Sequence, residues 1–104
     1  MRIARLYVGL QNYADAAERE RAAVERIARA AGGVTVTRGQ GAWIDGNGRL
    51  VAEPCAVFMV GAADGGITES ALECLFSVFD REDAIAVERN GDLEIVGRPA
   101  LVAA

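Results

Sequence analysis

The hydrophobic pattern of the chain switches between the two-residue period of a strand and the longer period of a helix. In residues 4–11, the apolar side chains of Ala4, Leu6 and Val8 alternate with other positions, which predicts a strand. Residues 15–31 combine strong helix formers with opposite charges four positions apart, and they end at a glycine pair. This second segment therefore predicts a helix with a polar outer face.

The middle of the chain predicts a hairpin followed by a buried strand. Residues 34–44 are β-branched and alternating at first, and their two glycines indicate a bulge or bend. The sequence DGNG at 45–48 is typical of a tight turn, after which residues 50–52 return as a strand. Because proline has no backbone donor, Pro54 is expected to interrupt pairing before the apolar run CAVFMV at 55–60.

A second helix and a terminal hairpin follow. Either Thr68 or Ser70 is a suitable N-cap for the helix, which carries a stripe of large apolar side chains. The stripe consists of Leu72, Leu75, Phe76 and Phe79. Residues 84–88 and 93–96 then flank Asn90-Gly91, and this dipeptide between alternating runs is a strong hairpin signal.

The order of these elements predicts one α+β domain. Strand, helix, strand, strand, helix, strand is the ferredoxin-like βαββαβ pattern, in which an antiparallel sheet carries both helices on one face. The terminal hairpin adds a further strand. We therefore expect a single domain over residues 1–98, with residues 99–104 as a tail.

The CAVFMV strand is apolar on both sides, although two helices cover only one face of such a sheet. A large exposed apolar patch is unusual on a monomer, so the sequence predicts that the open face is an interface. We expect its residues to be Ile3, Tyr7, Val57 and Met59, and a second copy of the chain or another protein to cover them. The alternative is that the terminal hairpin or tail folds over this face.

Charge is distributed unevenly along a chain with a net charge of −4. Residues 1–52 carry eight arginines against five acidic residues, whereas residues 53–104 carry three arginines against ten acidic residues. An ordinary solvated surface explains this asymmetry, and so does an acidic surface that binds a basic protein. The residues expected on the acidic surface are Glu69, Glu73, Asp80, Glu82, Asp83, Glu88, Asp92 and Glu94.

Several residue types and motifs that common active sites and binding sites need are missing from the sequence. The chain has no histidine and only two cysteines without C-x-x-C spacing, which argues against zinc sites and the usual nucleophile–base pairs. No cofactor, metal or catalytic residue is therefore expected. No apolar stretch approaches the roughly 20 residues of a membrane helix, and aromatic RNA-binding motifs are missing, so a cytoplasmic protein without membrane or direct nucleic-acid contact is expected.

These observations favour a non-catalytic module, a small acidic inhibitor or adaptor that engages a basic protein surface. The alternative is a small-molecule enzyme built as a dimeric α+β barrel, with a pocket on the open sheet face. Tyr7, Arg38, Glu53 and Cys55 would line that pocket, because a carboxyl and a thiol in an apolar setting are the best candidate for an active site that the sequence offers. Trp43 is a candidate binding anchor, although core packing explains it equally well.

Three short motifs resemble a family of small, uncharacterised bacterial ferredoxin-like proteins. They are RLYVGL at residues 5–10, GAW at 41–43 and GRLVAEP at 48–54. The resemblance implies the ferredoxin-like fold and brings no established activity with it. By size and charge alone, the chain is also similar to phage-borne anti-CRISPR-type inhibitors, which implies an inhibitory role.

Overall fold

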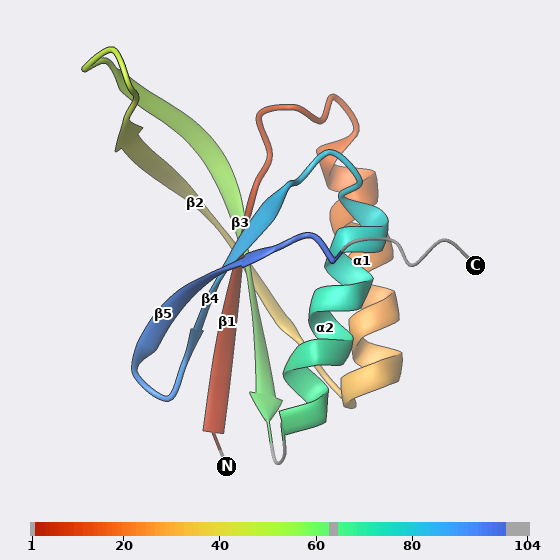
Figure 1. The fold of residues 1–104 in the computed structure, drawn as a ribbon. Coiled ribbons are helices and arrows are strands. Elements are labelled where there is room, and N and C mark those ends of the chain that lie inside the picture. The colour runs from red at the N-terminus through yellow and green to blue at the C-terminus, as the bar shows by residue number, and fades with distance from the viewer. Residues whose placement is uncertain (1, 63–64, 100–104) are drawn as a thin grey trace.

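Two helices pack on one face of a five-stranded antiparallel sheet (Figure 1). The computed structural model describes residues 2–62 and 65–99. The elements in chain order are β1 (Arg2–Gly9), α1 (Ala16–Ala31), β2 (Thr35–Ile44), β3 (Leu50–Ala62), α2 (Gly65–Val78), β4 (Ala84–Arg89) and β5 (Asp92–Gly97). The strand order is β2-β3-β1-β4-β5. The predicted α+β class and the two helices are confirmed, and the arrangement fits a ferredoxin-like fold broadly.

The core lies between the sheet and the helices, and strand alternation determines which side chains enter it. Leu6 on β1, Phe58 on β3 and Val87 on β4 point toward the helices and are fully buried. Helix α1 contributes mainly Ile27, whereas α2 contributes a broad apolar face that includes Leu75. The neighbours of these residues along each strand point to the opposite face, which carries no helix (Figure 1).

Helix α2 begins earlier than either predicted cap. It starts at Gly65, so Thr68 lies within the first turn and is only 2% exposed. Ile67 packs against the core, and this contact draws the preceding residues into the helix although glycine is a weak helix former. The prediction that Thr68 or Ser70 caps the helix is therefore wrong.

The β2–β3 hairpin is longer and more regular than the sequence suggested. Its register runs without a break from Thr35 opposite Met59 to Ile44 opposite Leu50, so the predicted bulge at the glycines is wrong. Pro54 does not interrupt the strand either. Its carbonyl accepts a hydrogen bond of 2.9 Å from the Leu10 amide, which shows that its backbone faces away from β2 and that no β2 bond needs the missing donor.

The last two strands form a hairpin through Asn90 and Gly91, whose φ angles of 55° and 81° are those of a type I′ turn. Strand β5 pairs with β4 and becomes one edge of the sheet. Both hairpins swing away from the helices, so the open face of the sheet is concave (Figure 1). Of the predicted tail, only Pro99 lies in the described range. No helix in residues 2–62 and 65–99 has the length and apolar character to cross a bilayer.

Candidate functional site

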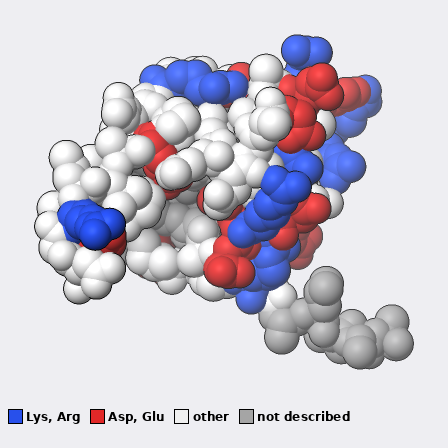
Figure 2. Space-filling model, turned by 90° about the horizontal axis from the view of Figure 1, so that it is seen from above, with Lys and Arg blue, Asp and Glu red and all other residues white. Residues whose placement is uncertain are grey.

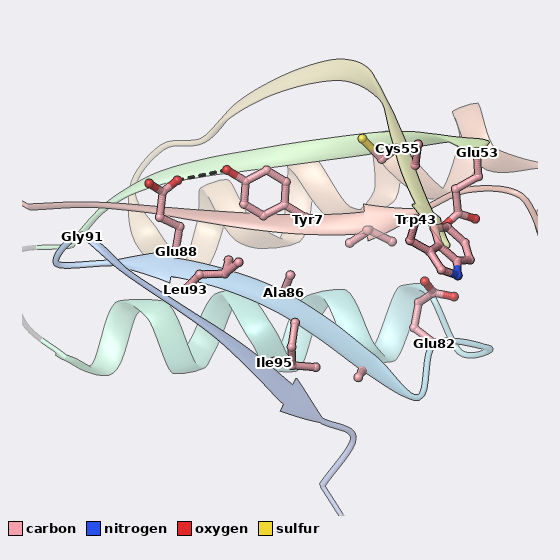
Figure 3. A pocket seen from close by; sticks show the side chains of 15 residues that line it. Tyr7, Trp43, Glu53, Cys55, Glu82, Ala86, Glu88, Gly91, Leu93 and Ile95 are labelled. Atoms are coloured by element: carbon pink, nitrogen blue, oxygen red, sulfur yellow. Dashed lines mark hydrogen bonds between the residues drawn. The ribbon is translucent and has the colours of Figure 1, made fainter. Parts of the chain in front are cut away.

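A trough of about 1160 Å³ occupies the concave open face of the sheet, between the two hairpins. Small and apolar side chains form most of its surface, among them Cys55, Ala86, Leu93 and Ile95. Two aromatic residues and three carboxylates complete the lining. They are Tyr7, Trp43, Glu53, Glu82 and Glu88 (Figure 3). We call this cavity the open-face trough.

Several large apolar side chains around the trough are exposed to solvent. Trp43 is 47% exposed, and Leu93 and Ile95 on the edge strand are 66% and 69% exposed. The predicted interface residues lie on the same face of the sheet. Ile3 and Tyr7 on β1 alternate with its buried residues, and Val57 and Met59 do so on β3. No described segment of the chain covers this face, and its burial against a second copy stays a prediction.

One end of the trough brings together Trp43 from β2, Glu53 from β3 and Glu82 from the segment before β4 (Figure 3). We call these three residues the carboxylate end. Glu53 lies directly over Gly9, since a Cβ atom on Gly9 would be 2.5 Å from Glu53 Oε1. Only glycine leaves room there for the carboxylate. Among the described residues, Glu53 and Glu82 form no ion pair with an arginine.

Glu82 is held in a partly buried position. The Tyr13 hydroxyl donates to Glu82 Oε2 at 3.2 Å and itself accepts from the Arg81 amide at 2.9 Å. Burial raises the pKa of Glu82 above its ordinary value, and the nearby negative charge of Glu53 adds to this effect. Burial also raises the pKa of Tyr13 to about 12, so its hydroxyl remains a donor at neutral pH.

This environment predicts that Glu82→Gln stabilises the folded protein at pH 8. Since the pKa of Glu82 is raised in the fold, the stability that it contributes when protonated is complete below about 4.5 and is lost as pH rises through the raised pKa. The amide of the glutamine variant does not ionise, so the variant does not lose this stability as pH rises. In thermal unfolding measured from pH 4 to pH 8, the melting temperature of the variant should rise relative to that of the wild type as pH rises. Glu73→Gln, at an exposed position on α2, should show no such trend, and equal trends in both variants would contradict the prediction.

The opposite end of the trough contains a tyrosine–carboxylate pair. The Tyr7 hydroxyl donates to Glu88 Oε1 at 3.0 Å (Figure 3), and Arg5 Nη1 lies 3.5 Å from the same oxygen. Burial and the bond to Glu88 raise the pKa of Tyr7. The trough therefore has a polar group at each end and an apolar middle.

The cysteines and the possible metal ligands offer little chemistry. Cys55 lies in the trough, half-buried, and both cysteines are free. Burial raises the pKa of Cys74, which keeps that thiol protonated among core residues. In the part of the chain that the structure describes, no three Cys, Asp or Glu side chains gather as metal ligands would.

The eight residues of the predicted acidic surface do not form one surface. Glu69 and Glu94 pair with Arg89, Asp80 pairs with Arg19 and Glu88 pairs with Arg5. Glu73, Asp83 and Asp92 are exposed on different elements. Glu82 and Glu88 line the trough. Figure 2 shows acidic and basic side chains interspersed on one side of the molecule and a mostly uncharged surface on the other.

Three of the four residues of the alternative pocket meet in the trough, namely Tyr7, Glu53 and Cys55. Arg38 does not, because it lies on the helix-facing side of β2 and pairs with Glu20 of α1. Sequence reasoning missed Glu82, Glu88, Leu93 and Ile95 as residues of this site. The only sequence signal for Glu88, Leu93 and Ile95 was the period-two alternation of the last hairpin, which places them on the same face of the sheet as Tyr7.

No family model and no curated protein matches the chain. Among solved structures, a phage SAM lyase in complex with S-methyl-5'-thioadenosine matches with a TM-score of 0.62 and 14% identity, covering 93% of this chain and 89% of that chain. The same phage SAM lyase in its apo state matches with a TM-score of 0.60 and 14% identity, over 95% and 90% of the two chains. The prediction of a non-catalytic, anti-CRISPR-like inhibitor is corrected by this finding, because the structures that this chain resembles are those of an enzyme. At this identity, what the comparison shows is a shared fold.

Proposed function

We propose that this chain is a lyase that cleaves S-adenosylmethionine (SAM) in the open-face trough and releases S-methyl-5'-thioadenosine. The observation that carries the proposal is the trough itself, an apolar cavity with an aromatic residue and unpaired carboxylates at one end. It lies on a fold shared with a phage SAM lyase over nearly the whole chain. This function corresponds to the small-molecule enzyme that the sequence offered as an alternative, and not to the predicted inhibitor.

The trough complements the shape and charge of SAM. Its volume of about 1160 Å³ slightly exceeds the roughly 300–1,000 Å³ that is usual for small-molecule pockets. SAM combines a flat adenine with a positive sulfonium and a positive ammonium group. Aromatic faces attract such cations, and Trp43 provides one beside Glu53 and Glu82. The apolar middle, with Ala86 and Leu93, suits the uncharged part of the nucleoside.

The chemistry needs no histidine. Release of S-methyl-5'-thioadenosine breaks the bond between sulfur and Cγ of the aminobutyrate chain, and the electron pair of that bond neutralises the sulfonium. If the carboxylate of the same substrate attacks Cγ, a γ-lactone forms and no proton moves. Opposite charges disappear in this step, and the apolar lining of the trough favours their disappearance because separated charges are less stable beside apolar surface than in water. The trough residues therefore bind and orient the substrate, and proximity supplies much of the rate.

We also infer that β1 to β4 form a ferredoxin-like core to which β5 is added. The order β2-β3-β1-β4 with antiparallel neighbours supports this assignment. Strand β5 then extends the open face and supplies one wall of the trough through Leu93 and Ile95.

Incubation with SAM and mass spectrometry of the products test the proposal directly. We expect S-methyl-5'-thioadenosine to accumulate together with a lactone, and in H₂¹⁸O the label should enter the carboxyl group of homoserine only after the lactone opens. Label in the hydroxyl group would indicate hydrolysis instead of lyase activity. Trp43→Ala should reduce the rate, whereas Ile44→Ala should not, since Ile44 is 64% exposed on the opposite side of β2. The absence of S-methyl-5'-thioadenosine would refute the proposal.

Gly9→Ala is expected to lower activity and leave the fold intact. The new Cβ would lie 2.5 Å from Glu53 Oε1, so the carboxylate must move by about an ångström, and displacements of this size cost roughly 10- to 100-fold in rate. Only the end of a flexible side chain has to shift, so the melting temperature should change little. Gly97→Ala is the matched control, because a Cβ there meets no atom within 4 Å. A Gly9→Ala variant with wild-type kinetics would contradict the assigned position of Glu53.

A further inference from the structure

The segment that carries Glu82 is fixed by Arg98, which follows the last strand. The Arg98 guanidinium donates to three backbone carbonyls, those of Phe76, Phe79 and Glu82, each at 2.9 Å. Its own amide donates to the Asp83 carbonyl at 2.7 Å, and its guanidinium stacks 5.0 Å from the centre of the Phe76 ring. Arg98 therefore joins the end of α2, the chain before β4 and the chain after β5.

The Glu82 side chain is oriented from the opposite side of the same segment. The Tyr13 hydroxyl donates to its carboxylate at 3.2 Å. The carboxylate is thus directed into the trough beside Trp43 and Glu53 (Figure 3). Arg98 holds the backbone of Glu82 and Tyr13 holds its side chain, so the position of Glu82 is set by contacts outside the trough.

The charge of the carboxylate end has no compensation in the described chain. Glu88 at the other end has Arg5, and Glu69 and Glu94 share Arg89, but no ion pair involves Glu53 or Glu82. Arg98 bonds the carbonyl of Glu82 and not its carboxylate. Two partly buried, unpaired carboxylates repel each other and are stabilised by an opposite charge that enters with a ligand. Burial and, to a smaller extent, the negative charge of Glu53 raise the pKa of Glu82.

We propose that Glu82 determines the selectivity of the trough for positively charged adenosyl ligands over neutral ones, and that Arg98 is the positioning residue that holds Glu82 in place. This inference rests on the proposed function, because it assumes that the trough binds an adenosyl compound. Glu82 interacts with the positive charge of the ligand, and the apolar and aromatic lining contacts the adenine.

Calorimetric titration with three ligands that the lyase reaction does not consume tests the inference. Sinefungin carries a protonated amine in place of the sulfonium, and S-adenosylhomocysteine has no charge at that position. Both keep the ammonium and the carboxylate of the amino-acid end, whereas S-methyl-5'-thioadenosine carries none of these charges. The measured quantity is the ratio of dissociation constants between the charged ligands and S-methyl-5'-thioadenosine. This ratio does not depend on the fraction of protein that is folded, so a loss of stability alone leaves it unchanged.

Glu82→Gln should reduce the preference for sinefungin over S-methyl-5'-thioadenosine by about tenfold, which lies between the effect of one close charge pair in bulk water and that of one near a protein surface. If the variant also binds S-adenosylhomocysteine more weakly, Glu82 interacts with the ammonium group. If its affinity for S-adenosylhomocysteine is unchanged, Glu82 interacts with the charge at the sulfonium position. Either result supports the inference. Asp83→Asn, which removes the same charge at the next, exposed residue, should leave the ratio unchanged.

Arg98→Ala should lower the ratio as Glu82→Gln does, and the double variant should lose no more than either single variant, because both act through one carboxylate. Should Arg98→Ala fold poorly, Arg98→Lys serves, since an ammonium group cannot span three carbonyls. Arg98 variants that melt earlier but keep the wild-type ratio would show that Arg98 is structural only. Wild-type protein that binds none of the ligands would overturn the proposed function as well, whereas binding with an unchanged ratio in Glu82→Gln would overturn this inference alone.

Discussion

Replacing Glu53 with glutamine is expected to reduce the kcat/KM for SAM cleavage by about 100-fold. Glu53 extends into the trough over Gly9 with no partner among the described side chains, so its charge is available to a cationic substrate. Removal of one member of a desolvated charge pair costs about 2–5 kcal/mol, and 100-fold lies within that range. Release of S-methyl-5'-thioadenosine, followed over a range of SAM concentrations, measures the effect.

Glutamine has nearly the shape of glutamate, so the fold should be preserved, and an unchanged melting temperature is the control for this. Glu94→Gln removes the same charge on β5, but Glu94 pairs with Arg89 and does not line the trough. We expect it to retain wild-type kinetics. If Glu53→Gln and Glu94→Gln behave alike, the carboxylate end has no role in catalysis.

The core was predictable because its signal is local and repeats along the chain. Alternation in RLYVGL and CAVFMV indicated which side chains are buried, and Leu6 and Phe58 are indeed fully buried. The stripe of α2 was equally clear, with Leu75 and Phe79 both at 0% exposure. Errors arose where tertiary contacts override local preference. Ile67 draws two glycines into α2, and Leu10 bonds the carbonyl of Pro54 from a different strand.

The trough was only partly predictable, since it joins segments that are far apart in the sequence. Glu53 and Cys55 drew attention as a carboxyl and a thiol in an apolar setting, and both line the trough. Glu82 was assigned to an acidic surface because its neighbours, Asp80 and Asp83, are also acidic. Burial of Glu82 depends on Tyr13 and Arg98, and no pattern near Glu82 shows either contact.

Under the proposed function, the exposed apolar face binds a small molecule, whereas the sequence alone predicted a protein interface there. The apolar run CAVFMV was evidence for a protein interface by the rule that large apolar patches are covered. The same rule holds for a small-molecule site, because an apolar ligand also covers such a surface. The carboxylates distinguish the two cases, since unpaired charges at Glu53 and Glu82 oppose a dry protein interface and favour a cationic ligand.

Phe79→Ala is expected to destabilise the fold by about 3–5 kcal/mol, the usual loss for removing a buried phenylalanine. Phe79 is fully buried and its ring centre lies 5.3 Å from that of Tyr13 and 6.1 Å from that of Phe58, so truncation leaves a cavity shared by helix and sheet. Domains of this size have about 5–15 kcal/mol of stability in total, so the variant should be marginal at 37 °C.

Urea unfolding of Phe79→Ala and of Leu93→Ala separates the core from the open face. Leu93 is 66% exposed, so its truncation should change the free energy of unfolding by less than about 0.5 kcal/mol. Equal losses in the two variants would mean that Leu93 is buried in solution, as it would be if a second copy covered the trough. Because Tyr13 stacks on Phe79 and donates to Glu82, Phe79→Ala should also weaken ligand binding at temperatures where the variant is still folded. The core thus supports the trough through Tyr13. If Phe79→Ala loses stability but keeps its affinity for the ligand, Tyr13 does not connect the core to the trough in this way.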